Sequence, residues 1–367
     1  MKKKIFIIIG ILVLVFFGKA IFKTLSLSPF FFQVFFNKNI DLKKTQDRVN
    51  ILLLGVGGGT HDGTYLTDTI IFASLDTKNN KATLVSIPRD LWVPDLLNTD
   101  KKINTAYSDA ESKETGGGII VSSAAIGKIL NQQIDYVARI DFSGFVKAVD
   151  LLGGINVNVE NVLDDYQYPI SGKENDICGH TDSEVIDLSA QIATGSATGL
   201  EAFPCRYKHI HFDKGLIVMS GEQALEFVRS RHADGEEGSD FARSKRQEEI
   251  IKAVKDRVLS LNVLINSSKL VDFYDIISSS IDTNIKENEF DDFVRLAMKM
   301  KDANISNVVL DYGDKDRAGL LINPYISQTF NNEWVLIPRI GNNNFSEIQK
   351  YVKCEIEVGN CTISNTP

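Results

Sequence analysis

Short apolar runs separated by turn-forming residues predict three strands near the start of the chain. Ile51-Leu52-Leu53-Leu54 is a continuous apolar run that closes at Gly55, and Thr69–Leu75 and Ala82–Ile87 follow as two more. Asn79-Asn80 lies between the last two runs, where asparagine favours a tight turn. The pattern therefore predicts three strands in close succession.

Helical periodicity alternates with strand-like runs over the rest of the chain. Ser220-Gly221-Glu222-Gln223 is a capping box that opens a helix over Glu222–Val228, and Phe241–Leu261 has the apolar spacing of a long helix. Further helices are predicted over Ser122–Leu130, Phe145–Leu152 and near 289–301, and further strands over Tyr136–Phe142, Ile155–Val159, near 307–311 and near 334–338. This alternation predicts a mixed α/β/α sandwich with a central sheet.

The domain boundaries follow from the same pattern. Residues 50–353 are assigned to a single domain, because no clear linker interrupts them after residue 50. Residues 164–214 are polar and rich in glycine, and they are interpreted as an insertion. Residues 354–367 form a C-terminal tail.

A strongly apolar N-terminal segment predicts that the domain is exported. Three lysines, Lys2 to Lys4, precede an apolar segment over residues 5–22 in which Lys19 is the single charge. Because Lys19 is close enough to the far interface to snorkel, residues 5–22 are predicted as an uncleaved transmembrane helix preceding the sandwich. The positive-inside rule then places residues 1–4 in the cytoplasm and the body outside, after a juxtamembrane linker at 23–49.

Two alternatives concern this region. A cleaved signal peptide ending at Gly18-Lys19-Ala20 also exports the body, although the lysine disfavours cleavage. Residues 30–36, which are rich in phenylalanine, are interpreted either as a segment on the membrane surface or as a packed amphipathic helix.

Charge distribution excludes one class of partner. The 367-residue chain has a net charge of −8, but residues 1–44 contain eight lysines and one acid, which leaves the remainder at −15. Phosphate neutralisation needs a basic face, so we expect no nucleic-acid binding. An anionic ligand must instead be bound by a local cluster of cations.

Four cysteines agree with export. Cys178 and Cys205 lie in the polar insertion, and Cys354 and Cys361 lie near the C-terminus. An even number of cysteines in an exported protein predicts disulfides, whose pairing the sequence leaves open. The alternative is a metal site formed by Cys205 with His209 and His211, although this spacing matches no established zinc pattern.

Several charged side chains lie at the ends of predicted elements. Asp68 precedes a strand, Arg89-Asp90 follows one, and Arg229 and Arg231 alternate so that an extended backbone would point both to one side. Arg243 and Gln247 share one helix face, and Arg246 is turned away from it. Arginines around one carboxylate favour a compact anion site that a divalent metal can join. The alternative is a set of surface ion pairs with Glu226, Glu236, Glu237 and Glu248.

From Asn50 to about Val352, the chain resembles the LytR-CpsA-Psr family of bacterial cell-envelope enzymes. The matching blocks, in the family's order, are Leu66–Ile71, Leu84–Asp90, Lys102–Tyr107, Asp141–Val146, Leu151–Ile155, Met219–Leu225, Val228–Arg231 and Asp240–Gln247. The resemblance implies an Mg²⁺-dependent (or Mn²⁺-dependent) phosphotransferase at the outer face of a bacterial membrane. Its donor would be a polyprenyl-pyrophosphate-linked glycan, and its acceptor a hydroxyl of peptidoglycan.

The family pattern also implies roles for individual residues. The metal-binding aspartate falls on Asp68, the pyrophosphate-binding arginines fall on Arg89, Arg229, Arg231 and Arg243, and a glutamine falls on Gln247. Asp90 and Lys102 are further candidates for substrate binding. The chain departs from the family at Gly57, where relatives commonly have an acid, and Asp62 in the same loop is the candidate replacement as a metal ligand. Two alternatives therefore remain, namely a non-catalytic polyprenyl-phosphate-binding protein and a lipid pyrophosphate hydrolase.

Overall fold

The computed structural model describes most of the chain after its N-terminal segment. The described residues are 37, 39–58, 64–96, 98–258, 260, 281–313 and 318–364. The predicted cytoplasmic tail and transmembrane helix, the phenylalanine-rich stretch at 30–36 and Asp62 lie outside them. No helix within the described ranges has the length and apolar content needed to cross a membrane.

A six-stranded mixed sheet occupies the centre of the described part. Its strands are β1 (Arg48–Val56), β2 (Thr67–Asp76), β3 (Lys81–Ser86), β6 (Tyr136–Asp141), β11 (Ile281–Thr283) and β12 (Asn304–Val309). They are arranged in the order β11-β6-β1-β2-β3-β12, and β1, β2 and β3 form an antiparallel meander. The three predicted N-terminal strands and the Asn79-Asn80 turn are therefore confirmed.

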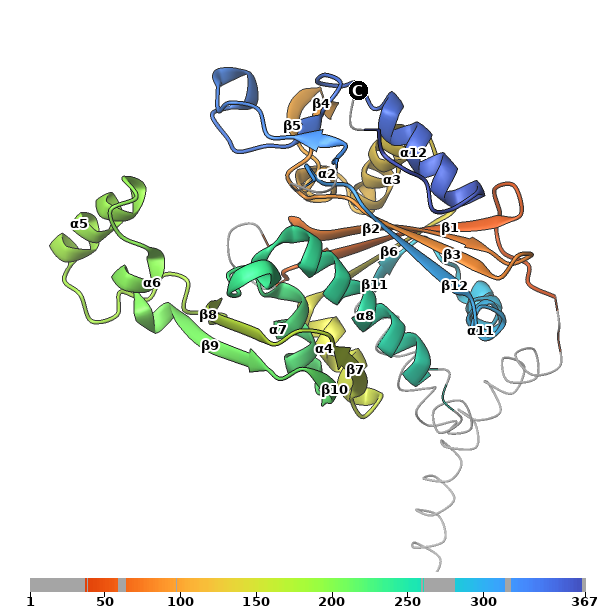
Figure 1. The fold of residues 1–367 in the computed structure, drawn as a ribbon, viewed down its shortest axis with the longest axis horizontal. Coiled ribbons are helices and arrows are strands. Elements are labelled where there is room, and N and C mark those ends of the chain that lie inside the picture. The colour runs from red at the N-terminus through yellow and green to blue at the C-terminus, as the bar shows by residue number, and fades with distance from the viewer. Residues whose placement is uncertain are drawn as a thin grey trace, which may run out of the picture.

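Helices cover both faces of this sheet (Figure 1). The helices are α2 (Thr105–Glu111), α3 (Gly117–Leu130), α4 (Phe142–Leu151), α5 (Asp182–Ala193), α6 (Gly199–Ala202), α7 (Gly221–Arg229), α8 (Asp240–Val258), α11 (Phe290–Lys299) and α12 (Ser346–Glu357). Leu52 and Leu54 of β1 point into a core shared with α2, α3 and α12. Leu53 points to the opposite face, where Ile251 of α8 packs. The alternation along β1 thus produces the predicted α/β/α layering.

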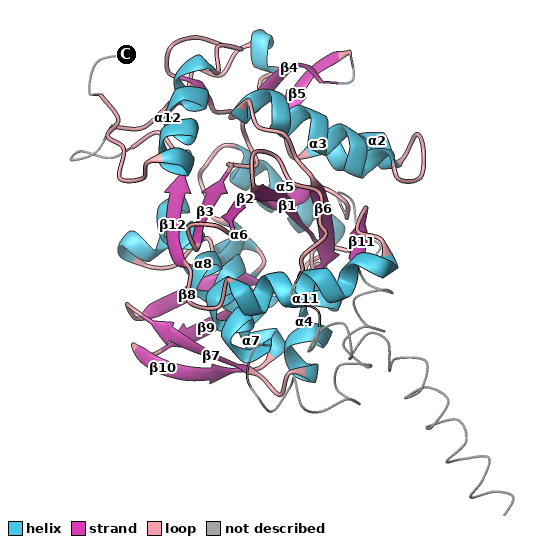
Figure 2. Cartoon of the chain, turned by 90° about the vertical axis from the view of Figure 1, so that its right-hand side faces the viewer, coloured by secondary structure: helices cyan, strands magenta, loops and turns pink. Residues whose placement is uncertain are grey.

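A second core lies on the far side of α8. It is built from α4, α7 and two-stranded ribbons whose strands are β7 (Ile155–Val159), β8 (Leu163–Pro169), β9 (Tyr207–Phe212) and β10 (Gly215–Met219). Ile250 and Ala253 of α8 point into this core, whereas Ile251 points to the sheet. Figure 2 shows these ribbons and α7 at the opposite end of the molecule from α3 and α12. Because α8 contributes to both cores, it fixes the second core relative to the sheet.

The remaining strands are short and lie at the rim of the fold. They are β4 (Trp92–Leu96), β5 (Thr99–Lys102), β13 (Leu321–Ile322) and β14 (Ile337–Pro338). β14 is shorter than the strand predicted near 334–338, because its only partner is the two-residue β13.

Local capping sets several helix boundaries. Ser220 accepts a hydrogen bond from the backbone N–H of Gln223, which confirms the predicted capping box of α7. Asp141 similarly caps α4 through the N–H of Gly144, so this helix begins at Phe142 rather than at the predicted Phe145. Gly221 allows α7 to approach α4 closely, because a Cβ there would overlap the carbonyl oxygen of Val146.

The ends of the polar insertion are packed into the second core, whereas its middle is exposed. Its ends form β8 and β9, whose Tyr168 and Ile210 are buried in the second core. Its middle projects from the body with α5 and α6 (Figure 1), and no residue of α5 is buried. A disulfide joins Cys178 to Cys205 there, and a second joins Cys354 to Cys361. The prediction of disulfides is confirmed. The alternative metal site that includes Cys205 is wrong, because the Cys205 sulfur is bonded to that of Cys178.

We expect the replacement of both Cys178 and Cys205 with serine to loosen the projecting loop while sparing the two cores. The disulfide closes a 27-residue separation, which corresponds to about 3.5 kcal/mol of loop-closure free energy in the chain-entropy model. Limited proteolysis should therefore cleave the double variant within 170–206 at much lower protease concentrations than the wild type.

The matched control for that experiment is the double serine variant of Cys354 and Cys361. This bond closes a separation of only seven residues, and its Cys354 lies within α12, which is anchored by buried Val352 and Ile356. It should leave cleavage at 170–206 unchanged. Equal resistance of all three proteins would show that the loop has sufficient packing of its own.

Candidate anion-binding site

Two arginines from distant parts of the chain converge on Asp68. Nη1 of Arg89 donates to Oδ1 of Asp68 at 2.6 Å, and Nη2 of Arg231 approaches the same oxygen at 3.3 Å. Asp68 lies on β2 beside the irregular end of the β1–β2 pairing, Arg89 follows β3, and Arg231 follows α7. Each of the three side chains is roughly one-third exposed, so the cluster is accessible to a ligand.

Asp90 and Lys102 support this cluster from one side. Nε of Arg89 lies 3.3 Å from Oδ2 of Asp90, and Nζ of Lys102 lies 3.1 Å from the other oxygen of Asp90. Lys102 also pairs with Glu333 at 3.0 Å. Because Lys102 is engaged by two carboxylates, its contact with Arg89 is indirect, through Asp90.

A cavity of about 300 Å³ opens beside the Asp68 cluster. Its lining includes Asp68, Thr69, Phe142, Gln167, Arg229, Arg231, Arg243 and Gln247. Gln247 donates from Nε2 to Oγ1 of Thr69 at 3.2 Å, which ties α8 to the start of β2. Arg243 and Gln247 line the cavity together, as their predicted common helix face requires. All four predicted phosphate-binding arginines therefore border the same site, with Arg89 in the adjoining recess that shares Asp68 and Arg243.

Arg229 does not share the orientation of Arg231, which corrects the sequence prediction. Arg229 is the last residue of α7, and the backbone leaves the helical conformation at the next residue, Ser230. The Arg229 guanidinium lies 4.1 Å from the ring centre of Phe142 and donates to the Tyr168 hydroxyl at 3.4 Å. Burial raises the pKa of Tyr168 to about 12, so the phenol stays neutral at physiological pH. Both arginines line the same cavity, but Arg229 does so from the end of a helix rather than from an extended segment.

Asp165 holds the backbone of the segment that contains Arg231, a role that the sequence did not reveal. Its side chain is almost fully buried, and Oδ2 accepts from the Ser230 hydroxyl at 2.8 Å and from the N–H groups of Arg231 and His232 at 3.3 Å. Asp165 belongs to residues 164–214, the segment that the sequence pattern predicts as a polar insertion. Its partners are about 65 residues away, so no local pattern identifies them.

Arg246 secures the same segment from the helix side. Nε donates to the carbonyl of Phe227 at 2.9 Å, and Nη2 donates to the carbonyl of Ser230 at 2.8 Å. Nη1 pairs with the Glu237 carboxylate at 2.8 Å. Burial lowers the pKa of the Arg246 guanidinium, and the ion pair with Glu237 opposes this effect. The prediction that Arg246 points away from Arg243 and Gln247 is consistent with this geometry, but its structural role emerges only from the fold.

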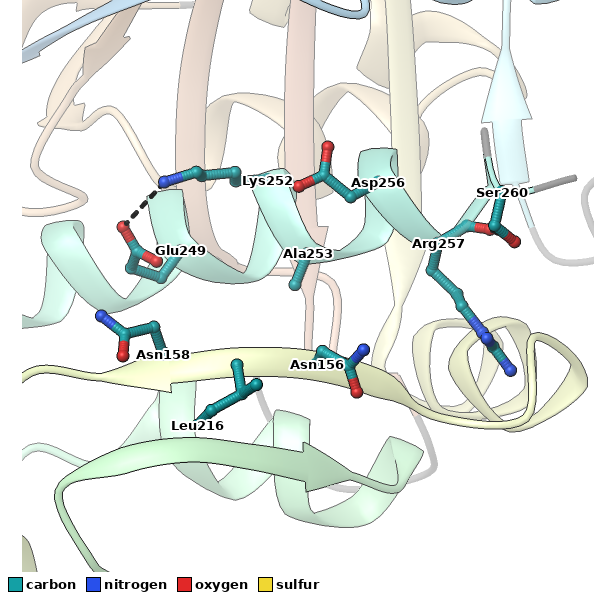
Figure 3. Close-up of a pocket in the computed structure, with 9 residues that line it drawn as sticks. All are labelled: Asn156, Asn158, Leu216, Glu249, Lys252, Ala253, Asp256, Arg257 and Ser260. Atoms are coloured by element: carbon teal, nitrogen blue, oxygen red, sulfur yellow. Dashed lines mark hydrogen bonds and ion pairs between the residues drawn. The ribbon is translucent and has the colours of Figure 1, made fainter.

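A second cavity lies elsewhere and has a different lining. It measures about 370 Å³ and lies between α8 and the β7–β10 ribbon, where Asn156, Asn158 and Leu216 face Glu249 and Lys252 (Figure 3). None of the predicted site residues lines it. The presence of a cavity alone therefore does not distinguish the two places, whereas the concentration of guanidinium groups around Asp68 does.

The donor groups at Asp68 fit a divalent cation of the Mg²⁺ type. Oδ1 is engaged by Arg89 and Arg231, and Oδ2 has no hydrogen-bond partner in the described ranges. Mg²⁺ is commonly held by one or two carboxylates together with substrate phosphates and water. Gly57 supplies no side chain, and Asp62 lies outside the described residues, so Asp68 is the one predicted metal ligand whose position is known.

The fold and the site together define a mixed α/β protein with an arginine-lined cavity beside the carboxylate of Asp68. A family model agrees with this class, because the LytR_cpsA_psr family matches residues 32–333. The chain belongs to this family.

Curated relatives of this chain are named as teichoic acid transferases. The chain is 31% identical over 243 residues to a Bacillus cereus protein named polyisoprenyl-teichoic acid–peptidoglycan teichoic acid transferase TagU, covering 65% of this chain and 60% of the relative. It is 28% identical over 257 residues to Bacillus subtilis TagV, a transferase of the same name, covering 69% and 53%. The matched region thus spans between about half and three-fifths of these relatives.

Solved structures share the fold. The crystal structure of B. subtilis TagV superposes with a TM-score of 0.55 at 23% identity, covering 85% of this chain and 98% of that chain. A structure described as TagT bound to LI-WTA gives 0.52 at 19% identity, covering 88% and 96%. These likenesses confirm a mixed α/β architecture with a central sheet.

Proposed function

We propose that the protein is a membrane-anchored phosphotransferase that attaches a glycopolymer to peptidoglycan at the outer face of a bacterial membrane. The observation that supports this proposal best is the convergence of Arg89 and Arg231 on Asp68, beside a cavity that Arg229 and Arg243 also line. The transferase names of the curated relatives agree with it, and so do the two disulfides, which are common in exported proteins.

The arginines suit a pyrophosphate better than a single carboxylate. Each guanidinium presents a planar set of donors that can hold two phosphate oxygens, and it keeps its charge at all physiological pH values. Three of them line one cavity and Arg89 lies in the adjoining recess, so four guanidinium groups gather near Asp68 and Asp90. In a chain that is strongly acidic elsewhere, this local concentration of positive charge favours a highly charged anionic ligand.

The sheet face below α8 suits the lipid part of the donor. Leu53 of β1 and its neighbours Ala138 and Ile140 of β6 point to this face, and all three are only half-buried. On the opposite face, Leu52 and Leu54 are fully packed. The half-buried row leads along β1 to Gly55, whose partner Thr69 lines the anion cavity. An apolar chain lying there would gain burial while its phosphates reached the arginines.

The chemistry follows from these positions. The acceptor hydroxyl attacks the phosphorus that bears the glycan and releases its proton to solvent, a new P–O bond forms, and the P–O bond to polyprenyl phosphate breaks so that this phosphate leaves. Arg89 and Arg231 stabilise the charge that grows on the departing phosphate, and Arg229 and Arg243 orient the donor. Asp68 would hold a divalent cation through Oδ2, and such a cation supplies further charge neutralisation at the phosphates when bound.

Replacing Asp68 with asparagine should separate donor binding from turnover. The amide keeps the size of the side chain but removes its charge, so cation binding weakens while Arg89 and Arg231 remain available to the phosphates. Transfer from a polyprenyl-pyrophosphate-linked glycan to peptidoglycan oligomers should fall about 10²–10³-fold. The amount of polyprenyl lipid that copurifies with the variant, measured by mass spectrometry, should be unchanged.

The same assay distinguishes the alternative functions. Wild-type protein should release polyprenyl phosphate only when peptidoglycan oligomers and Mg²⁺ or Mn²⁺ are both present. Release at the full rate without an acceptor would identify a hydrolase. Bound lipid with no release under any of these conditions would identify a binding protein and overturn the proposal.

A further inference from the structure

Three metal-ligating side chains converge on the exposed face of the β8–β9 ribbon, and none of them lines the arginine cavity. Nε2 of His209 and Nδ1 of His211 both lie 2.8 Å from Oδ1 of Asp164. One ligand atom from each residue lies within 4.8 Å of the others. We call these three residues the His₂Asp cluster.

The ribbon itself prepares this arrangement. His209 and His211 are two positions apart on β9, so both side chains point to the same face. Asp164 pairs directly with His211 in the β8–β9 register, which places its carboxylate between the two imidazoles. The opposite face of the ribbon is buried through Ile210 and Phe212. The cluster is therefore carried by a strand pair whose register the second core fixes.

Two further contacts orient the imidazole rings. Nε2 of His211 lies 3.3 Å from a carboxylate oxygen of Asp213, so the ring has one nitrogen directed to the cluster and the other directed to a carboxylate. This is the usual outer contact of a metal-bound histidine. The ring of Tyr166 stacks on His209 with centres 4.0 Å apart and planes within 1° of parallel. Both rings are thus oriented before any ion arrives.

We propose that the His₂Asp cluster binds one divalent transition-metal ion of the Zn²⁺ class. Two imidazole nitrogens and one carboxylate oxygen are the ligands that such ions prefer, whereas Mg²⁺ selects oxygen ligands alone. All three side chains are partly exposed, between 28% and 44%, so a fourth coordination position is open to water or to a partner's side chain. This site is separate from the cation position at Asp68.

Binding here would act on the ribbon that supports the arginine cavity. Asp164 and Asp165 are consecutive residues of β8 and point to opposite faces, one to the cluster and one to the segment that contains Arg231. An ion that joins Asp164 to His209 and His211 ties β8 to β9 directly beside Asp165. We therefore expect the ion to slow amide exchange in β8 and β9.

The test uses the full-length protein in detergent, titrated with Zn²⁺ against a competing chelator. Wild type should bind one equivalent, and the double variant His209→Ala/His211→Ala should bind at least 100-fold more weakly, since the loss of two ligands exceeds the 10–100-fold effect of an outer contact. Co²⁺ substituted for Zn²⁺ should give the intense visible absorption of a low-coordinate N/O site in wild type alone. Hydrogen exchange should show protection of β8 and β9 on addition of Zn²⁺.

His180→Ala is the matched control, because this histidine lies in the same insertion and contacts Phe203 rather than the cluster. It should retain wild-type Zn²⁺ affinity. Asp164→Asn provides a second test if the double variant is unstable, and it should weaken binding at least 10-fold. Equal Zn²⁺ affinity in the wild type and the cluster variants would overturn the proposal and indicate adventitious binding only. Absence of Zn²⁺ binding by the wild type would overturn it as well.

Discussion

Replacing Arg231 with alanine should lower glycopolymer transfer about 10²–10³-fold and leave the protein folded. Arg231 is partly exposed, and its pairing with Asp68 at 3.3 Å is of the kind that contributes at most about 1 kcal/mol to stability. The catalytic effect is larger, because the guanidinium would stabilise charge that develops on the departing phosphate in a site that partly excludes water. Arg89→Ala should behave in the same way, since Arg89 contacts the same oxygen of Asp68.

Both arginine variants should also lose the copurifying lipid that Asp68→Asn retains. This difference separates a phosphate clamp from a general loss of structure. Arg206→Ala is the matched control, because Arg206 lies in the projecting loop and donates to the carbonyl of Asp176. Full transfer activity in both Arg89→Ala and Arg231→Ala would remove the basis of the proposed function. Arg231→Lys should recover only part of the rate, because a single ammonium cannot hold two oxygens at once.

Replacing Arg246 with methionine should lower the free energy of unfolding by about 3–5 kcal/mol. The side chain is 5% exposed, and its removal leaves the carbonyls of Phe227 and Ser230 without these donors and Glu237 without its cation. Breaking one partner of a buried pair is costly, because the other charge remains desolvated. Urea denaturation followed by far-UV circular dichroism measures the change.

Transfer by the Arg246 variant should also fall at temperatures where it remains folded, because Ser230 links α7 to Arg231. The neighbouring Lys245→Ala is the matched control. Lys245 is 47% exposed and pairs with Glu160 at the surface, so its loss should change stability by no more than about 1 kcal/mol. Similar stability of both variants would contradict the structural role assigned to Arg246.

The secondary structure and much of the site were predictable because their signals are local. The apolar runs at 51–54, 69–75 and 82–87 become β1 to β3, and the capping box at Ser220 begins α7. Arg243 and Gln247 were placed together by helical spacing alone. The resemblance of motif blocks added Asp68, Arg89 and Arg231 as members of one site, which spacing by itself left open.

Three features depended on contacts between distant segments. Asp165 and Arg246 hold the Arg231 segment through partners that share no local pattern with them. The Arg229 side chain lies against Phe142, because α7 extends as far as Arg229 and the backbone there is helical rather than extended as expected. His209 and His211 lie beside Asp164 because β8 pairs with β9, which is a contact between segments that are distant in the sequence.

The sequence alone thus determined the main strands and helices, the layered α/β architecture and the disulfide chemistry, since each is encoded by residue type and short-range periodicity. The set of arginines followed from the resemblance of its motif blocks to the family. The tertiary structure alone decided which cations meet Asp68, which buried groups hold them, and which side chains cluster on the β8–β9 ribbon. Asp68 and Arg231 are 163 residues apart in the sequence. The packing of α8 between two cores brings the Arg231 guanidinium and the Asp68 carboxylate together. Packing of that kind depends on the whole chain, so no local segment specifies it.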